Sequence, residues 1–258
     1  MQVEKCMGKK FATLGYGFHL EETRIMLAFA LQQDDQQSVR DYCIQNWPQK
    51  SVPNKVRMWN HLSKRYFKID RGRILHTPFL KLYGKLAANE QDSLDLIFFK
   101  LCCETPVVFE SLRALATSSF LNTGEAVFAK YHLDQLLENI FGHVPKSTCE
   151  RVRQILIKAG RLRLSGNNYT TVAYCPAEPV LGYVLYHDAE QNGWRAPSTL
   201  TIMEQGTIVP AFLCNRPLLV AATKRLASKG HCEYHQHGHT DQVQLTHHTL
   251  EEFVDAWQ

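Results

Sequence analysis

Apolar residues in the first third of the chain recur at helical spacing. The apolar positions between Leu20 and Leu31 fall on one face and predict a first helix. A second helix fits Ser38 to Asn46, and WPQKS then predicts a turn. Pro53 suits the first turn of a third helix that continues to about Phe67. Helix, short turn and helix form the outline of a helix-turn-helix.

The third predicted helix has two chemically different faces. At about 100° per residue, one narrow stripe is apolar and consists of Val56, Trp59, Leu62 and Tyr66. The nearly opposite side carries Arg57, Lys64 and Lys68. We therefore expect one face to pack on a core and the other to present cations to a partner.

Residues 78 to 121 are rich in Phe and Leu and predict further helices that serve as scaffold. From residue 122 the pattern changes. Glu125 to Phe141 is interpreted as a helix, and Ser147 and Glu150 have capping-box spacing at the start of another. That helix continues to Gly160, and RLRLS-GNN-YTTVAY predicts a β-hairpin. This is the element order of a winged helix-turn-helix.

A similar order recurs near the C-terminus. A short helix over 198–205 precedes a longer one that begins near Pro217 and ends at Gly230. A second hairpin follows, and TLEEFVDAW predicts a closing helix. The sequence thus predicts a mainly α fold: a helical domain with a basic helix-turn-helix-like unit over 1–121, a winged-helix unit over 122–176, and a second winged-helix-like unit with a small β-hairpin over 177–258.

Charge is distributed unevenly along the chain. The net charge is only +4. Residues 50–73 nevertheless carry eight cations against Asp70, and residues 146–163 carry six against Glu150. Such concentration creates a local field that favours a polyanionic partner. We expect double-stranded DNA contacted mainly through its backbone, and the expected contact residues are Lys50, Lys55, Arg57, Lys64, Arg65, Lys68, Arg71, Arg73, Arg151, Arg153, Lys158, Arg161, Arg163, Asn167 and Asn168.

Two alternatives remain open at this stage. Winged-helix units also serve as protein–protein interaction scaffolds, and RNA offers the same phosphates as DNA. A continuous positive strip joining the two basic blocks favours nucleic acid, whereas separate patches favour the scaffold.

The eight cysteines form no CxxC pair, which is typical of reduced thiols in a cytoplasmic protein. No apolar run approaches the length of a membrane span, and no secretory signal is visible. The second predicted hairpin is rich in histidine, including His235, His237 and His239. Zinc sites need three or four converging ligands, and Gly238 predicts a turn between these residues, so we expect a polar wing without a metal.

Enzyme signatures are absent from the sequence. There is no phosphate-binding GxxxxGK[ST] loop, no HExxH and no GxSxG. The acidic pairs Glu21-Glu22 and Asp34-Asp35 are adjacent in sequence, so their side chains diverge around a helix and give little support to a metal-dependent nuclease. We expect neither catalysis nor a cofactor.

Three segments resemble the BrxA family of bacteriophage-exclusion (BREX) defence systems: FHLEETRIMLAFAL, the basic helix ending in KRYFK, and STCERVRQILIKAGRL. The corresponding residues are Glu21 and Glu22, then Arg57 to Arg65, then Thr148 to Gly160. The resemblance covers about residues 18 to 165, and the segment from about 177 is additional to it. It implies a bacterial, cytoplasmic DNA-binding accessory without known catalysis, with other proteins of the defence system as partners.

Overall fold

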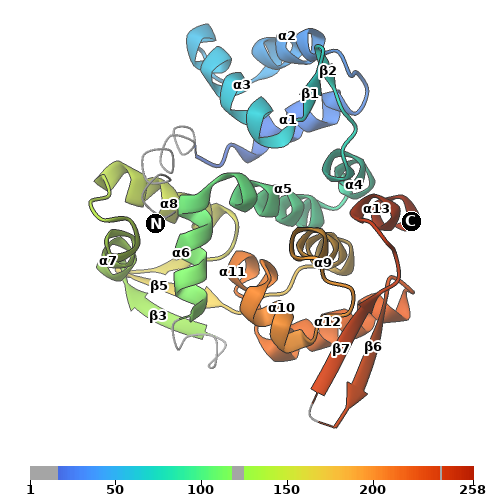
Figure 1. Ribbon diagram of the computed structural model, residues 1–258. Coiled ribbons are helices and arrows are strands. Elements are labelled where there is room, and N and C mark those ends of the chain that lie inside the picture. Colours follow the sequence, from blue (N-terminus) through green and yellow to red (C-terminus); the bar gives the residue numbers. More distant parts are fainter. Residues whose placement is uncertain (1–16, 118–124, 239) are drawn as a thin grey trace.

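The chain is mainly helical with small antiparallel sheets, and the hairpin of β6 (Cys232–His237) and β7 (Thr240–Leu245) projects from the lower edge of the molecule (Figure 1). The computed structural model describes residues 17–117, 125–238 and 240–258. The predicted boundary between residues 121 and 122 lies outside the described residues. The predicted fold class is confirmed.

The upper lobe in Figure 1 contains the first three helices and a short hairpin. Its elements are α1 (Leu20–Ala30), α2 (Gln36–Asn46), α3 (Val52–Tyr66), β1 (Ile69–Asp70) and β2 (Arg73–Ile74). The hairpin turns at Arg71 (φ 48°) and Gly72 (φ 79°), and positive φ at both central positions suits a tight two-residue turn. Sequence periodicity did not reveal this hairpin, because each strand has only two residues.

Three helices continue from the upper lobe into the body of the molecule. They are α4 (Pro78–Leu86), α5 (Glu90–Glu104) and α6 (Pro106–Thr117), as expected for this Phe- and Leu-rich stretch. Helix α5 packs against α3, α4, α6 and α9 (Glu178–Asn192), so it lies at the centre of the fold. Its Phe98 and Phe99 are fully buried and both contact the ring of Phe212.

The next unit is a winged helix. It consists of β3 (Glu125–Ala129), α7 (Lys130–Phe141), α8 (Lys146–Lys158), β4 (Arg163–Ser165) and β5 (Asn168–Val172). The strands form one antiparallel sheet in the order β3-β5-β4. Helix α6 packs on both α7 and α8 and completes the three-helix core of this unit.

Two expectations about this unit are wrong. Residues 125–129 are a strand rather than the start of a helix, because they pair with β5 from Glu125↔Val172 to Ala129↔Asn168. Helix α8 also begins two residues earlier than a cap at Ser147 requires. It starts at Lys146 with Pro145 at the N-cap position, and no side chain caps it.

The last unit repeats the order of helices followed by a hairpin. After α9 it contains α10 (Thr199–Gln205), α11 (Ile208–Phe212), α12 (Arg216–Ser228), β6 (Cys232–His237), β7 (Thr240–Leu245) and α13 (Leu250–Ala256). The predicted turn at Gly238 is confirmed, with φ 62°. His239 lies outside the described residues. The closing helix α13 packs on α4 and α9, which lie beside it in Figure 1.

The same succession therefore occurs three times: α1–α2–α3 with β1–β2, α6–α7–α8 with β4–β5, and α9–α10–α12 with β6–β7. In each case a long helix, α3, α8 or α12, directly precedes the hairpin. Within the described residues, no helix combines the length and apolar character that crossing a bilayer would require.

Candidate nucleic-acid interface

Helix α3 has the two faces that its sequence predicts. Trp59, Leu62 and Tyr66 are buried in the core. On the opposite side Arg57 and Lys64 are exposed, and Lys68 is exposed two residues after the helix ends. The helix therefore presents cations to solvent while its aromatic side holds the upper lobe together.

Three further cations flank this face. Lys50 and Arg71 are exposed in the turns before and after α3. Arg73 is also exposed, and one of its guanidinium nitrogens lies 3.5 Å from a carboxylate oxygen of Asp34. Arg73 is therefore partly neutralised.

Lys55 and Arg65 belong to the same basic block but face the interior. The Lys55 ammonium donates a 2.7 Å hydrogen bond to the carbonyl of Ile44, near the C-terminal end of α2. Such a cation suits the negative end of a helix dipole. Arg65 is 5% exposed and donates to the carbonyl of Gly17 at 3.3 Å. These two residues join helices, and they are removed from the expected set of phosphate contacts.

Arg153 and Arg161 are removed for the same reason. Arg153 is buried and forms an ion pair with Asp134 of α7. Arg161 is buried with Asp95 of α5, to which it donates at 2.6 Å, and its guanidinium lies 4.2 Å from the ring centre of Tyr174. Burial raises the pKa of the Asp95 carboxyl, while the Arg161 charge and a hydrogen bond from Tyr174 oppose that rise.

The outer face of α8 carries the remaining cations of the second block. Arg151 and Lys158 are exposed and line a hollow of about 230 Å³ together with Gln154. The opposite wall of this hollow is the segment Gly17–His19 that precedes α1. On the adjoining wing, Arg163, Asn167 and Asn168 are exposed, as expected.

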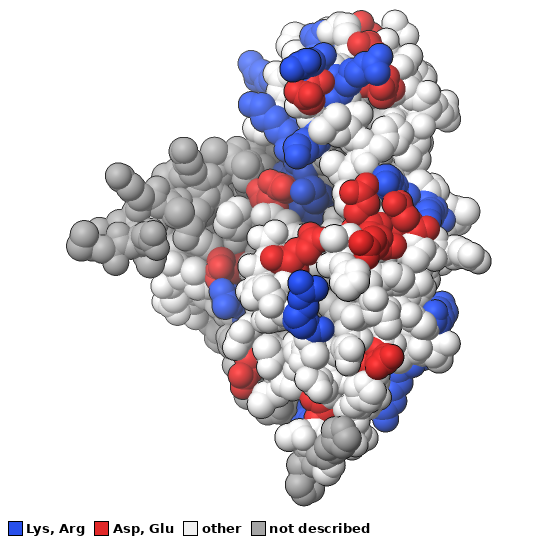
Figure 2. Space-filling model, turned by 45° about the vertical axis from the view of Figure 1, so that its right-hand side comes forward, with Lys and Arg blue, Asp and Glu red and all other residues white. Residues whose placement is uncertain are grey.

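The two basic blocks meet at the segment Gly17–His19. Lys64 and Arg65 of α3 line a neighbouring hollow with Glu104, and Arg65 bonds to Gly17, which lines the α8 hollow. The segment is held on its other side by His19, whose hydrogen bond to Glu22 lowers the pKa of that carboxyl to about 2. Figure 2 shows blue Lys and Arg atoms running down the edge of the upper lobe to its junction with the body.

Ion pairing divides the cations of the molecule into two groups. Among the described residues, the exposed cations for which we find no carboxylate partner are concentrated in the upper lobe and the first winged unit: Lys50, Arg57, Lys64, Lys68, Arg71, Lys130, Lys146, Arg151, Lys158 and Arg163. Elsewhere they are Lys85 of α4, which donates to backbone carbonyls of α13, and Arg195 and Lys224 of the last unit. The last unit differs. Its Arg216 pairs with Asp241, and Arg225 and Lys229 both pair with Glu178.

The sequence analysis did not name two polar residues that lie on the cationic faces of these helices. Asn60 and Gln154 are exposed on the cationic faces of α3 and α8, between the Arg and the Lys of each helix. Charge counting gives an uncharged amide no weight. Aligning the two helices by their buried positions would have found both residues.

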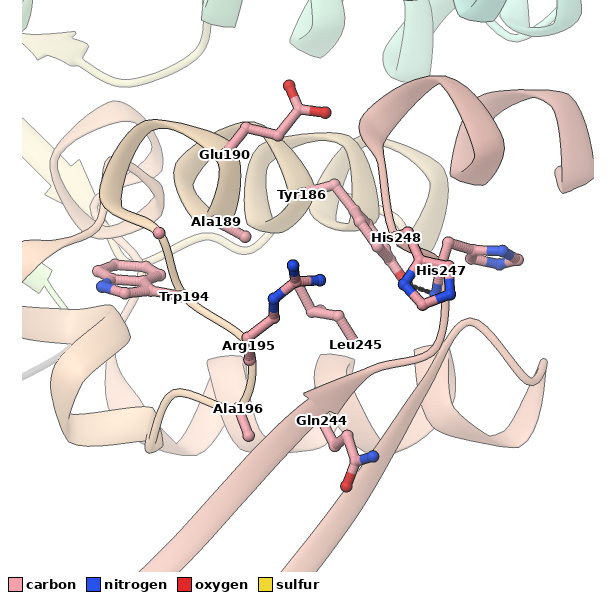
Figure 3. Close-up of a pocket in the computed structure, with 11 residues that line it drawn as sticks. Tyr186, Ala189, Glu190, Trp194, Arg195, Ala196, Gln244, Leu245, His247 and His248 are labelled. Carbon is pink, nitrogen blue, oxygen red and sulfur yellow. Dashed lines mark hydrogen bonds between the residues drawn. The ribbon is translucent and has the colours of Figure 1, made fainter.

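A separate hollow of about 660 Å³ lies between α9 and β7 (Figure 3). Arg195 reaches into it, and Tyr186 and His247 lie together at one end. The single acidic residue among its lining side chains, Glu190, accepts a 2.7 Å hydrogen bond from the backbone of Leu250. Arg195 is the one Lys or Arg among the residues that line this hollow, and Glu190 in its lining caps the start of α13. The hollow therefore does not continue the positive strip of the two basic blocks.

Histidines at the base of the second hairpin form a packed pair. Nδ1 of His231 lies 3.2 Å from Nε2 of His247, and the His231 ring stacks on Trp257. Burial, with His247 and Lys229 nearby, lowers the pKa of His231. In the part of the chain that the structure describes, no group of three or more His, Cys, Asp or Glu residues could hold a metal ion.

The fold has neighbours among solved structures, although the sequence matches no known family and no curated protein. A crystal structure of a protein called SspB is similar with a TM-score of 0.60 and 12% identity, over 90% of this chain and 82% of that one. A magnesium-ion-bound SspB crystal structure has a TM-score of 0.56 and 13% identity over the same shares. At this identity the likeness concerns the fold alone.

Proposed function

We propose that this chain binds double-stranded DNA through α3 and the first winged-helix unit, mainly by contacts to the phosphate backbone. The observation that carries the proposal is the distribution of unpaired exposed cations over these two elements and their turns. Phosphate contacts need cations that are free to exchange counterions. The two sets adjoin through Arg65 and Gly17, which supports one extended strip over two separate patches.

The resemblance of the first two thirds of the chain to BrxA proteins supports a cellular setting for this activity. We place the protein in the bacterial cytoplasm as an accessory of a phage-defence system, without catalysis of its own. The seven cysteines among the described residues are all free thiols, which agrees with a reducing compartment.

The last winged-helix unit favours a second role, contact with another protein. Arg216 and Arg225 of α12 pair with Asp241 and Glu178 of the same unit, and the ammonium of Lys224 lies 5.0 Å from the centre of the Tyr234 ring. Leu200 of α10 and Leu218 of α12 are instead 55% and 37% exposed. This unit is the place where the scaffold alternative applies, and defence-system proteins are the expected partners.

Retardation of a duplex at several salt concentrations tests the proposal. We expect log K to fall linearly with log salt, with a slope of about −0.9 for each phosphate contacted and several contacts in total. RNA duplexes of equal length should bind more weakly than DNA if the elements fit B-form grooves. A response that is independent of salt would exclude DNA binding and leave the scaffold role.

A further inference from the structure

Helices α3 and α8 are equivalent in position and in the residues that they expose. Both immediately precede the hairpin of their unit. In each helix the fourth, seventh, eighth and eleventh residues are buried: Lys55, Met58, Trp59 and Leu62 in α3, and Cys149, Val152, Arg153 and Leu156 in α8. The two helices therefore turn the same helical positions toward the core.

The exposed sides match in chemistry as well. The sixth, ninth and thirteenth residues are Arg57, Asn60 and Lys64 in α3, and Arg151, Gln154 and Lys158 in α8. All six side chains are exposed. We find no hydrogen bond or ion pair from any of them to another described residue. We call each set an Arg–amide–Lys stripe.

Helix α12 provides an internal comparison. It occupies the corresponding place in the third unit, but its sixth, ninth and thirteenth residues are Ala221, Lys224 and Ser228. It lacks the arginine and the amide, and the cations elsewhere on it are paired. Among the three helices that precede a hairpin, the stripe is thus confined to α3 and α8.

We infer that Asn60 and Gln154 are base-reading residues and give the protein a preference for adenine at two places in its DNA site. The inference rests on the proposed function. Asn and Gln pair with N6 and N7 of adenine through two hydrogen bonds, while the Arg and Lys of each stripe contact phosphates under the proposed function. From its first to its last residue a stripe rises about 10 Å along its helix, which corresponds to roughly three base pairs.

Selection from a pool of random duplexes tests the inference. The wild-type protein should enrich two short sub-sites, each containing an A·T pair. Asn60→Ala should remove the preference at one sub-site and Gln154→Ala at the other, with discrimination falling roughly 5- to 150-fold, the effect of one bidentate base contact. Since both changes are neutral, the salt slope should stay the same. Gln191→Ala on α9, another exposed amide, is the matched control and should keep both sub-sites.

The possible outcomes distinguish a failure of base reading from a failure of DNA binding. Salt-dependent binding by the wild type without an enriched sequence, or variants that keep both sub-sites, would overturn the base-reading role and leave DNA binding intact. A wild-type protein that retards no duplex at low salt would overturn both.

Discussion

Four cations of the basic blocks stabilise the fold instead of contacting solvent. Lys55, Arg65, Arg153 and Arg161 are each at most 8% exposed, and each has a partner from another element. The desolvation cost of burying a cation is offset only when a matched acceptor is close. Substitution of these residues should therefore lower the stability of the fold. Any loss of ligand affinity should follow from that loss of stability.

Arg161 gives the clearest case. Arg161→Ala would leave the Asp95 carboxyl without its cation at a fully buried position, and we expect roughly 3–5 kcal/mol of lost stability. Denaturant unfolding measures this. The control is Asp95→Leu combined with Arg161→Met, which replaces the pair by apolar groups and should recover most of the loss. If Arg161→Ala leaves stability unchanged and weakens DNA binding, the residue acts at the surface after all.

The low pKa of Glu22 should make the stability of the fold depend on pH. Its pKa is lowered to about 2, mainly by the hydrogen bond with His19, and Gln49 donates to it as well. A depressed carboxyl pKa stabilises the fold above the unfolded value near 4.5, and this contribution is lost as the pH falls from about 4.5 to 2. Glu22→Gln should therefore be less stable than wild type at pH 6 by about 3 kcal/mol, and nearly equal in stability near pH 2. A constant difference across this range would contradict the assignment.

At the scale of elements, helices were easier to predict than the strand before them. The period of Val56, Trp59 and Leu62 is local, so it gives both the existence of α3 and the direction of its faces. Strand β3 depends on pairing with residues 168–172, which lie 39 to 47 positions later, and its sequence alone resembles the start of α7. Nonlocal pairing of this kind leaves little local signal.

The dependence on residues distant in sequence also explains why the candidate site was only partly predicted. Residues of the basic blocks are visible from composition, but their orientation depends on distant partners. Arg161 is buried because it pairs with Asp95. That partner lies 66 residues earlier in the chain, so no residue near Arg161 indicates the pairing. Conversely, the exposure of Arg57 and Lys64 could be predicted, because the apolar stripe of the same helix fixes the opposite face.

The faces of α3 can be separated by substitution. Arg57→Ala combined with Lys64→Ala should weaken DNA binding uniformly across sequences, reduce the salt slope by about two, and hardly change the melting temperature. Trp59→Ala should instead destabilise the fold by roughly 3–5 kcal/mol, since it empties a buried aromatic position. Unfolding curves and retardation assays give both quantities. Loss of binding by Trp59→Ala at unchanged stability would show that the ring contacts the ligand.

At the scale of the whole molecule, α13 joins the last unit to the first half of the chain. Lys81 of α4 donates to Glu251 at 2.8 Å, and Lys85 donates to the carbonyl of Val254 at the same distance. Phe253 is fully buried and stacks on Tyr186 of α9. The docking of one short helix therefore couples regions that are far apart in sequence.

Gly182 makes this docking possible. A Cβ atom at this position of α9 would overlap the ring of Phe253, which is fully buried. Gly182→Ala should lower stability by about 1–3 kcal/mol, as overpacking usually does, although alanine is the better helix former. Thermal unfolding measures the effect, and Phe253→Leu in the same chain should restore part of it. A stabilised Gly182→Ala variant would mean that α13 can move away without cost.

The contact between α4 and α13 also affects how the protein is made. Lys81 and Glu251 are 170 residues apart, and at about 5–20 residues per second α4 leaves the ribosome roughly 10–30 s before its partner. During that interval the surface of α4 that later receives α13 is open to the cell. The upper lobe, whose helices are close in sequence, can fold in this time, whereas the body of the molecule must wait for the synthesis of its last helix.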